Sequence, residues 1–412
     1  MPRKWSQCLA QRIVDAAAAG LCLTAARRLL WLEAVIIVAF CAGLALSPHL
    51  WIGPRSYPPA PVLAVLPPDG YAAQALYTTL FVLAAAILLR PRPRIVLAAF
   101  AAIVALFCLA DQTRWQPWVF LYEFLVVTLA LFSWRHDDAV GEEHTLNVAR
   151  LAIAGTYLWS GLQKLNGNFV DVEFPWIVAP ITDLMPATRG FLHACGLAVP
   201  FVQVGFGIGL MTRRFRTVSL ALAVAMHVFI LAMFGPAGQD WNDVVWPWTA
   251  AMAVLDVILF AGVHVAPRDI LLPRGNGRHR WRACWHVAAL ALFLALPALS
   301  LVNLWDSYLS AALYSGNVTE AQIYATDAAK AALPAPIARY LVHVAPDTNV
   351  INMQRWTIED LNVTPYPETR VFRAIARSVC DRLPDQGQLV LIVKEQRLLL
   401  NRPEMGFRCW QL

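Results

Sequence analysis

Long apolar runs separated by short polar connections dominate the first three quarters of the chain. Nine runs of 16 to 22 residues are bounded by Arg, Asp, Pro and Trp, and each approaches the length needed to cross the roughly 30 Å core of a bilayer. The runs are 29–47, 71–89, 95–110, 118–133, 146–165, 190–211, 217–234, 244–264 and 283–304. This pattern predicts an all-α polytopic membrane protein with about nine transmembrane helices and a transmembrane domain over 29–304.

Positive charge is distributed unequally between the two sets of connections that join these runs. Alternate connections, taken with the N-terminal segment, hold seventeen Lys and Arg residues, whereas the opposite set holds only Arg55, Arg114, Lys164 and Arg189. Lysine and arginine are enriched on the cytoplasmic side of membrane proteins. We therefore expect a cytoplasmic N-terminus and an extracytoplasmic C-terminus, and the abundance of Ala and Arg suggests a bacterial inner membrane.

Three segments outside the runs have distinct compositions. Residues 1–28 predict a cytoplasmic amphipathic segment that leads into the first span. The connection at 48–70 contains seven prolines, which exclude a regular helix through it. The connection at 166–189 carries the apolar stretch FPWIVAPI, which is too short to cross a membrane. Both connections are either re-entrant or interfacial segments that roof a cavity, or ordinary loops in the headgroup layer.

The overall composition narrows the class of protein. Hydrophobic residues make up 58% of the 412 residues and charged residues 15%, which excludes a soluble globular protein. The net charge of +6 is spread over short connections, so nucleic acid is not expected as a partner. The eight cysteines include no CxxC pair and the nine histidines no HxH or HExxH spacing. These patterns disfavour a thiol redox relay and predict no metal site.

The chain becomes more polar after the last run, and 305–412 predicts a small extracytoplasmic α+β domain. We expect helices at 319–333, where Thr319 and Gln322 form a capping-box pattern, and at 365–383. The stretch QLVLIVKE at 388–395 is expected to be a strand that pairs with 407–412.

Cys380 and Cys409 are the only cysteines of this C-terminal domain. Paired cysteines persist in an oxidising compartment. We therefore predict a structural disulfide between them.

Ionisable side chains inside the apolar runs are candidates for function, because each costs a few kcal/mol at membrane depth. Asp256 and His227 lie deepest within their runs, Lys164 lies at the outer end of 146–165, and Glu123 lies near the outer end of 118–133. A buried histidine is more often a packing residue than a catalyst, and a lysine at a helix end often reaches up to the lipid phosphates. Lys164 remains notable because the chain has only four lysines, and a lysine can deprotonate where an arginine cannot.

Two short motifs resemble a known family. The stretch YLWSGLQKLN at 157–166 resembles the signature of the HTTM domain, the membrane fold of vitamin K-dependent gamma-carboxylases, and more distantly that of DoxX-type membrane proteins. The stretch MHVFILAMFG, which contains His227, resembles a later helix of the same family. The resemblance covers about 146–264, and the matching residues of the first motif are Tyr157, Gly161, Lys164 and Leu165.

The resemblance implies a role for Lys164, because the matching lysine of the carboxylases is the base that starts oxidation of the quinol cofactor. The carboxylases commonly carry a second lysine where this chain has Gln163, and their lumenal region is larger than 305–412. What the resemblance implies here is therefore a cavity for a quinol or another lipid-like molecule.

Three functions remain open at this point. The first is an enzyme that acts on a quinone or quinol, with Lys164 as general base and Glu123 and His227 as further catalytic candidates. The second is a non-catalytic membrane subunit that binds lipid or quinone and docks a protein partner through 305–412. A transporter is disfavoured because no inverted pair of broken helices is visible.

The relation between Lys164 and Glu123 separates these functions. A close carboxylate would keep the lysine charged and structural, whereas an apolar pocket under Trp159 and 166–189 would favour a base. We expect Lys164 to lie in the apolar pocket, with Glu123 facing elsewhere.

Overall fold

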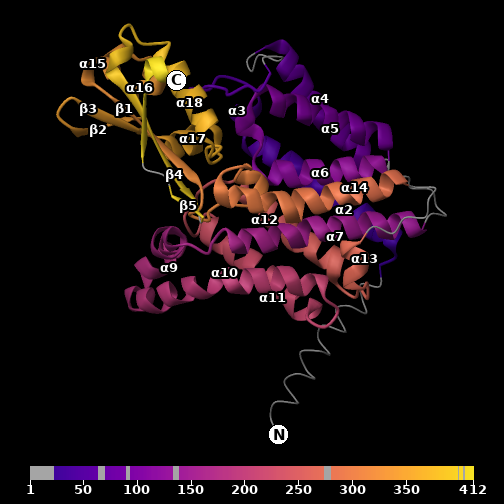
Figure 1. Ribbon diagram of the computed structural model, residues 1–412. Coiled ribbons are helices and arrows are strands. Elements are labelled where there is room, and N and C mark those ends of the chain that lie inside the picture. The colour runs from indigo at the N-terminus through magenta and orange to yellow at the C-terminus, as the bar shows by residue number, and fades with distance from the viewer. Residues whose placement is uncertain are drawn as a thin grey trace.

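The computed structural model describes residues 23–63, 70–89, 93–132, 139–272, 280–397, 399–401 and 404–412. Most of the predicted N-terminal amphipathic segment, residues 1–22, lies outside the described residues, as do residues 64–69 of the proline-rich connection. Figure 1 shows a bundle of long helices with a small domain of strands and helices at one end.

Each of the nine predicted runs coincides with a helix of the bundle. The last helix continues through a π-helical turn, η5 (Ala291–Ala295), and a 3-10 segment, η6 (Leu296–Val302). The nine helices are α2 (Ala25–Leu46), α4 (Tyr71–Leu89), α5 (Arg94–Ala110), α6 (Pro117–Leu131), α7 (Ala139–Leu162), α10 (Arg189–Met211), α11 (Arg216–Phe234), α12 (Val245–Phe260) and α14 (Arg280–Leu290).

Several of these helices fit a membrane by length and composition. Five helical segments in the described part of the chain are long and apolar enough to cross a bilayer: α2, α4, Pro186–Met211, α11 and Arg280–Val302. Helices α5, α6 and α12 are apolar but shorter. The fold is thus mostly helical and compatible with an integral membrane protein.

Helix α7 is the centre of the bundle and packs against α2, α6, α10, α12 and α14. Its crossing with α10 is tight because glycines face the opposing backbone. A Cβ at Gly161 would lie 2.7 Å from the backbone nitrogen of Val204, and one at Gly207 would lie 2.8 Å from that of Leu158. Small residues allow such close approach of membrane helices. This contact brings the C-terminal end of α7 beside the middle of α10.

The C-terminal domain contains an antiparallel sheet. Its strands run in the order β2-β3-β1-β4-β5, and β6 also pairs with β4. The strands are β1 (Thr319–Ala325), β2 (Leu341–Ala345), β3 (Thr348–Asn352), β4 (Leu389–Arg397), β5 (Leu400–Asn401) and β6 (Met405–Arg408). The helices of this domain are α15 (Asp327–Ala332), α16 (Ala335–Ala338), α17 (Met353–Leu361) and α18 (Thr369–Cys380).

The predicted helix at 319–333 is wrong over its first half. Residues 319–325 form β1, which pairs with β3 on one side and β4 on the other. Alternate residues of β1 are buried, including Ala321 and Ile323, and this period-2 burial outweighs the local capping-box signal. The predicted strand at 388–395 is confirmed as β4, and α18 lies within 365–383. The final residues pair with β4 only through β6, after which 409–411 form a 3-10 turn.

Cys380 and Cys409 form the disulfide that the sequence predicts, with their Cα atoms 5.7 Å apart. It joins the end of α18 to the residue after β6.

The C-terminal domain is held against the proline-rich connection of the bundle. One carboxylate oxygen of Asp360 accepts hydrogen bonds from the backbone N–H groups of Ser56 (2.8 Å) and Tyr57 (2.7 Å). The indole of Trp356 donates to the Ser56 hydroxyl at 2.8 Å. A short helix, α3 (Pro48–Trp51), is the only helix within the described part of 48–70, in agreement with its prolines.

Candidate functional site

A cavity of about 510 Å³ opens between α7, α10, α11 and α12. Its volume lies within the range of small-molecule sites, roughly 300–1,000 Å³. The walls are largely apolar and aromatic. Lining side chains include Phe120, Trp159, Phe206, Met226, Phe229, Trp248, Met252 and Phe293.

The connection at 166–189 closes one end of this cavity. It folds into a π-helical turn, η2 (Phe169–Glu173), and two short helices, α8 (Phe174–Ile177) and α9 (Ala179–Leu184). Phe169, Phe174 and Ile177 line the cavity, and Leu313 and Tyr314 from the start of the C-terminal region join them. The sequence left open whether this segment roofs a cavity or is an ordinary loop, and in the structure it roofs the cavity.

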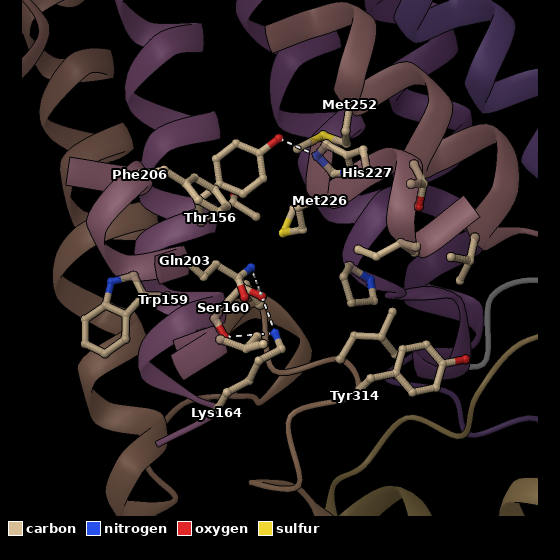
Figure 2. A pocket seen from close by; sticks show the side chains of 18 of the residues that line it. Thr156, Trp159, Ser160, Lys164, Gln203, Phe206, Met226, His227, Met252 and Tyr314 are labelled. Atoms are coloured by element: carbon tan, nitrogen blue, oxygen red, sulfur yellow. Dashed lines mark hydrogen bonds between the residues drawn. The ribbon is translucent and has the colours of Figure 1, made fainter. Parts of the chain in front are cut away.

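Lys164 lies in the turn just after α7 and lines the cavity. Its amine nitrogen, Nζ, lies 3.0 Å from the Ser160 carbonyl oxygen and 2.8 Å from the Ser160 hydroxyl. The Gln203 amide on α10 donates to the same hydroxyl at 2.9 Å. Figure 2 shows this cluster at one end of the cavity.

Lys164 has no acidic partner at contact distance. Among the described residues, no carboxylate oxygen lies within 4.0 Å of its amine, whereas the Phe169 ring centroid lies 5.9 Å away. Glu173 acts on the amine only through space, and burial, with a further contribution from Glu320, raises the pKa of Glu173 to about 7. The positive charge of Lys164 opposes this rise.

A second polar cluster lies deeper in the bundle. The Tyr157 hydroxyl lies 2.6 Å from Nε2 of His227 and donates to Oδ2 of Asp256 at 2.7 Å. Because a phenol carries a single proton, a donation to Asp256 means that Nε2–H of His227 donates to the Tyr157 oxygen. Asp256 is fully buried. Tyr157 thus joins two residues that the sequence identified separately as the deepest polar groups.

The two clusters belong to one cavity but do not touch. In Figure 2, His227 lies at one end and Lys164 with Ser160 at the other, with Met226 between them. Tyr157 and Ser160 are three residues apart on α7 and so share a side of it, and Lys164, four residues after Ser160 in the following turn, faces the same cavity. The cavity therefore has an apolar middle and two polar ends.

Glu123 does not join this site. It lines a separate groove between α5 and α6, together with Arg94, Val127 and alanines of α5. It is 8% exposed, and its Oε2 has no hydrogen-bond partner among the described residues. Helix α6 turns this face toward α5 rather than toward α7, so the structure separates Glu123 from Lys164.

Gln163, the residue before Lys164, is a structural residue. It is buried and faces away from the cavity, where its amide donates to the Ser300 hydroxyl at 2.7 Å. Its side-chain oxygen accepts a hydrogen bond from Asn317. These bonds anchor η6 and the segment before β1 to the end of α7.

The main residue that sequence reasoning missed is Ser160. Its spacing from Lys164 could have identified it, because residues four apart lie on the same face of a helix. The contribution of Gln203 from α10 has no comparable local signal, because the α7–α10 crossing decides it.

Comparison with protein-family models, curated proteins and solved structures finds no match for this chain. The site must therefore be interpreted from its own geometry. Among the described residues, no three His, Cys, Asp or Glu side chains lie close enough together to hold a metal ion.

Proposed function

We propose that this chain is an HTTM-like integral membrane enzyme in which Lys164 acts as a general base on a quinol or another lipophilic substrate. The observation that carries the proposal is an amine that no carboxylate of the described residues approaches within 4.0 Å, in a largely apolar cavity of about 510 Å³.

The surroundings of the amine support a base. An ammonium ion loses hydration in an apolar site, which favours the neutral amine. A nearby anion would favour the charged form instead. Glu123, the acid that the sequence offered as a partner, lies in another groove. The hydrogen bonds to Ser160 hold the amine at the cavity wall, where it can accept a proton from a bound hydroxyl group.

The lining supports a lipophilic substrate. Aromatic and aliphatic side chains surround the space between the two polar clusters. A substrate with a hydrophobic body can fill this space, while Lys164 at one end and the Tyr157–His227 pair at the other offer hydrogen bonds to polar substituents.

We further propose nine spans in a bacterial inner membrane, with the N-terminus cytoplasmic and the cavity and C-terminal domain on the outer side. The unequal distribution of Lys and Arg supports this orientation. A reporter that is active only outside the cytoplasm should work when fused after Leu412 and fail after Arg94 or Arg278. Activity at either of the last two sites would overturn the orientation.

Lys164→Arg tests the catalytic role, because arginine keeps the positive charge but cannot deprotonate. The purified protein in lipid nanodiscs would be given a short-chain quinol in air-saturated buffer, where dissolved oxygen accepts the two electrons, and quinol oxidation would be followed by absorbance. General-base catalysis contributes about 10²–10⁴-fold, so we expect a loss of at least about 100-fold. The matched control is Lys394→Arg on β4, which should keep full activity.

Full activity in Lys164→Arg would refute the base. Oxidation that is absent in the unaltered protein, together with a stoichiometric protein that copurifies with it, would favour the non-catalytic membrane subunit instead.

A further inference from the structure

Ser160 lies between two nitrogen-bearing side chains at the wall of the cavity. Its Oγ is 2.8 Å from the amine nitrogen of Lys164 and 2.9 Å from the amide nitrogen of Gln203. All three residues line the cavity. A serine hydroxyl within hydrogen-bond distance of a lysine amine is the arrangement that a nucleophile and its base require.

Two other aliphatic hydroxyls that line the cavity are engaged differently. Thr156 donates its hydroxyl to the backbone oxygen of Ala152 at 2.8 Å, and Ser310 donates to that of Asp306 at 2.9 Å. A hydroxyl proton held by a backbone carbonyl is not directed toward a base. Ser160 differs because the hydrogen-bond partners of its hydroxyl are the side-chain nitrogens of Lys164 and Gln203, and the lysine nitrogen can accept a proton when it is neutral.

We propose that Ser160 and Lys164 form a nucleophile and base pair that accepts an acyl group from a lipid ester bound in the cavity. This activity goes beyond the proposed function, with which it shares the cavity and the use of Lys164 as a base.

The chemistry balances without an oxidant or a metal. The Ser160 oxygen bonds to the ester carbonyl carbon while its proton moves to the amine of Lys164. The bond from that carbon to the alcohol oxygen then breaks, and the departing alkoxide takes the proton from Lys164. The products are an acyl ester on Ser160 and a free lipid alcohol, and attack by water or a second alcohol reverses the same steps to release the acyl group.

Gln203 has a positioning role in this reaction. A primary amide carries two N–H donors. One donates to the Ser160 hydroxyl, which leaves the hydroxyl proton free to point toward Lys164. The second is carried by the same nitrogen, 2.9 Å from the Ser160 oxygen, and in this proposal it donates to the ester carbonyl oxygen as negative charge develops.

A long-chain alkyl fluorophosphonate tests the pair directly. Its phosphorus bonds to a nucleophilic serine oxygen and releases fluoride, while the base takes the hydroxyl proton. The full-length protein in nanodiscs would be incubated with this probe, and the adduct would be located by peptide mass spectrometry. We expect one cavity adduct, on Ser160, that is absent in Ser160→Ala and forms at least tenfold more slowly in Lys164→Arg.

Thr145→Val is the matched control, because Thr145 lies on the same helix, donates its hydroxyl to the backbone oxygen of Gly141 at 2.8 Å and does not line the cavity. It should label at the rate of the unaltered protein. Absence of an adduct on Ser160 in the unaltered protein overturns the proposal, whatever the variants show, and so does an equal rate in Lys164→Arg. Loss of quinol oxidation in Lys164→Arg without any Ser160 adduct would retain the proposed function and refute this one.

Discussion

Replacing Tyr157 by phenylalanine tests whether the deep polar cluster holds α7, α11 and α12 together. The substitution removes one oxygen and keeps the ring, which packs against Phe206 with centroids 5.1 Å apart. That oxygen is the only hydrogen-bond partner the described residues provide for Nε2 of His227 and for Oδ2 of Asp256. The other polar atoms of these side chains, Nδ1 and Oδ1, already lack partners among the described residues.

The expected loss of stability follows from two interhelical hydrogen bonds. In water-soluble proteins, an unsatisfied buried group costs about 1–3 kcal/mol, which would give about 2–6 kcal/mol for two. Within a membrane the unfolded helices also find partners, and such bonds average about 0.6 kcal/mol with a maximum near 1.7. If α7, α11 and α12 span a membrane, as proposed above, the membrane value applies to two bonds, and we expect Tyr157→Phe to lower the free energy of unfolding by about 1–3 kcal/mol.

The assay is equilibrium unfolding in mixed detergent micelles, followed by the fluorescence of the sixteen tryptophans. Tyr122→Phe on α6 is the control, because Tyr122 is fully buried and its hydroxyl has no partner among the described residues. That change should be neutral or stabilising. If Tyr157→Phe lowers stability no more than Tyr122→Phe does, the cluster does not join the helices.

Three further measurements concern the C-terminal domain and the connection at 166–189. Reducing the Cys380–Cys409 disulfide should destabilise the C-terminal domain by about 3–4 kcal/mol on the chain-entropy model; unfolding at the same denaturant concentration with and without a reductant would contradict this. The pKa of Glu173 is raised from 4.5 to about 7 by burial, so the folded state binds this proton more tightly than the unfolded chain does. Its contribution to stability, about 1–3 kcal/mol, is present below pH 4.5 and is lost as the pH rises through 7, and Glu173→Gln should flatten that fall in a series of melting curves. Asp360→Ala leaves two buried backbone N–H groups of the proline-rich connection without their carboxylate and should cost about 3 kcal/mol or more, whereas its exposed neighbour Glu359→Ala should change stability by less than about 0.5 kcal/mol.

Local physics made much of the architecture predictable. An apolar run of the length of a bilayer must satisfy its own backbone hydrogen bonds, so each of the nine runs coincides with a helix in the structure. The pairing of Cys380 with Cys409 was predictable because the C-terminal domain offers no other cysteine. The proline content of 48–70 likewise excluded a long helix there.

Local signals failed where long-range pairing competes with them. Thr319 begins β1 rather than a helix. The strands β3 and β4 provide backbone partners for β1, and alternate side chains of β1 are buried. The residues 319–325 carry no local signal for β3 or β4, because both strands come later in the chain.

By itself the sequence determined the kinds of element, the depth of Asp256 and His227, and the unusual lysine at the end of α7, because these depend on composition and spacing along one segment. Only the tertiary structure decided which of these groups meet. The rotation of α6 turns Glu123 into its own groove, and the close approach of α7 and α10 at Gly161 brings Gln203 to the Ser160 hydroxyl. Contacts between separate helices depend on how each helix is rotated and where its backbone can approach the next, and a single apolar run does not contain that information.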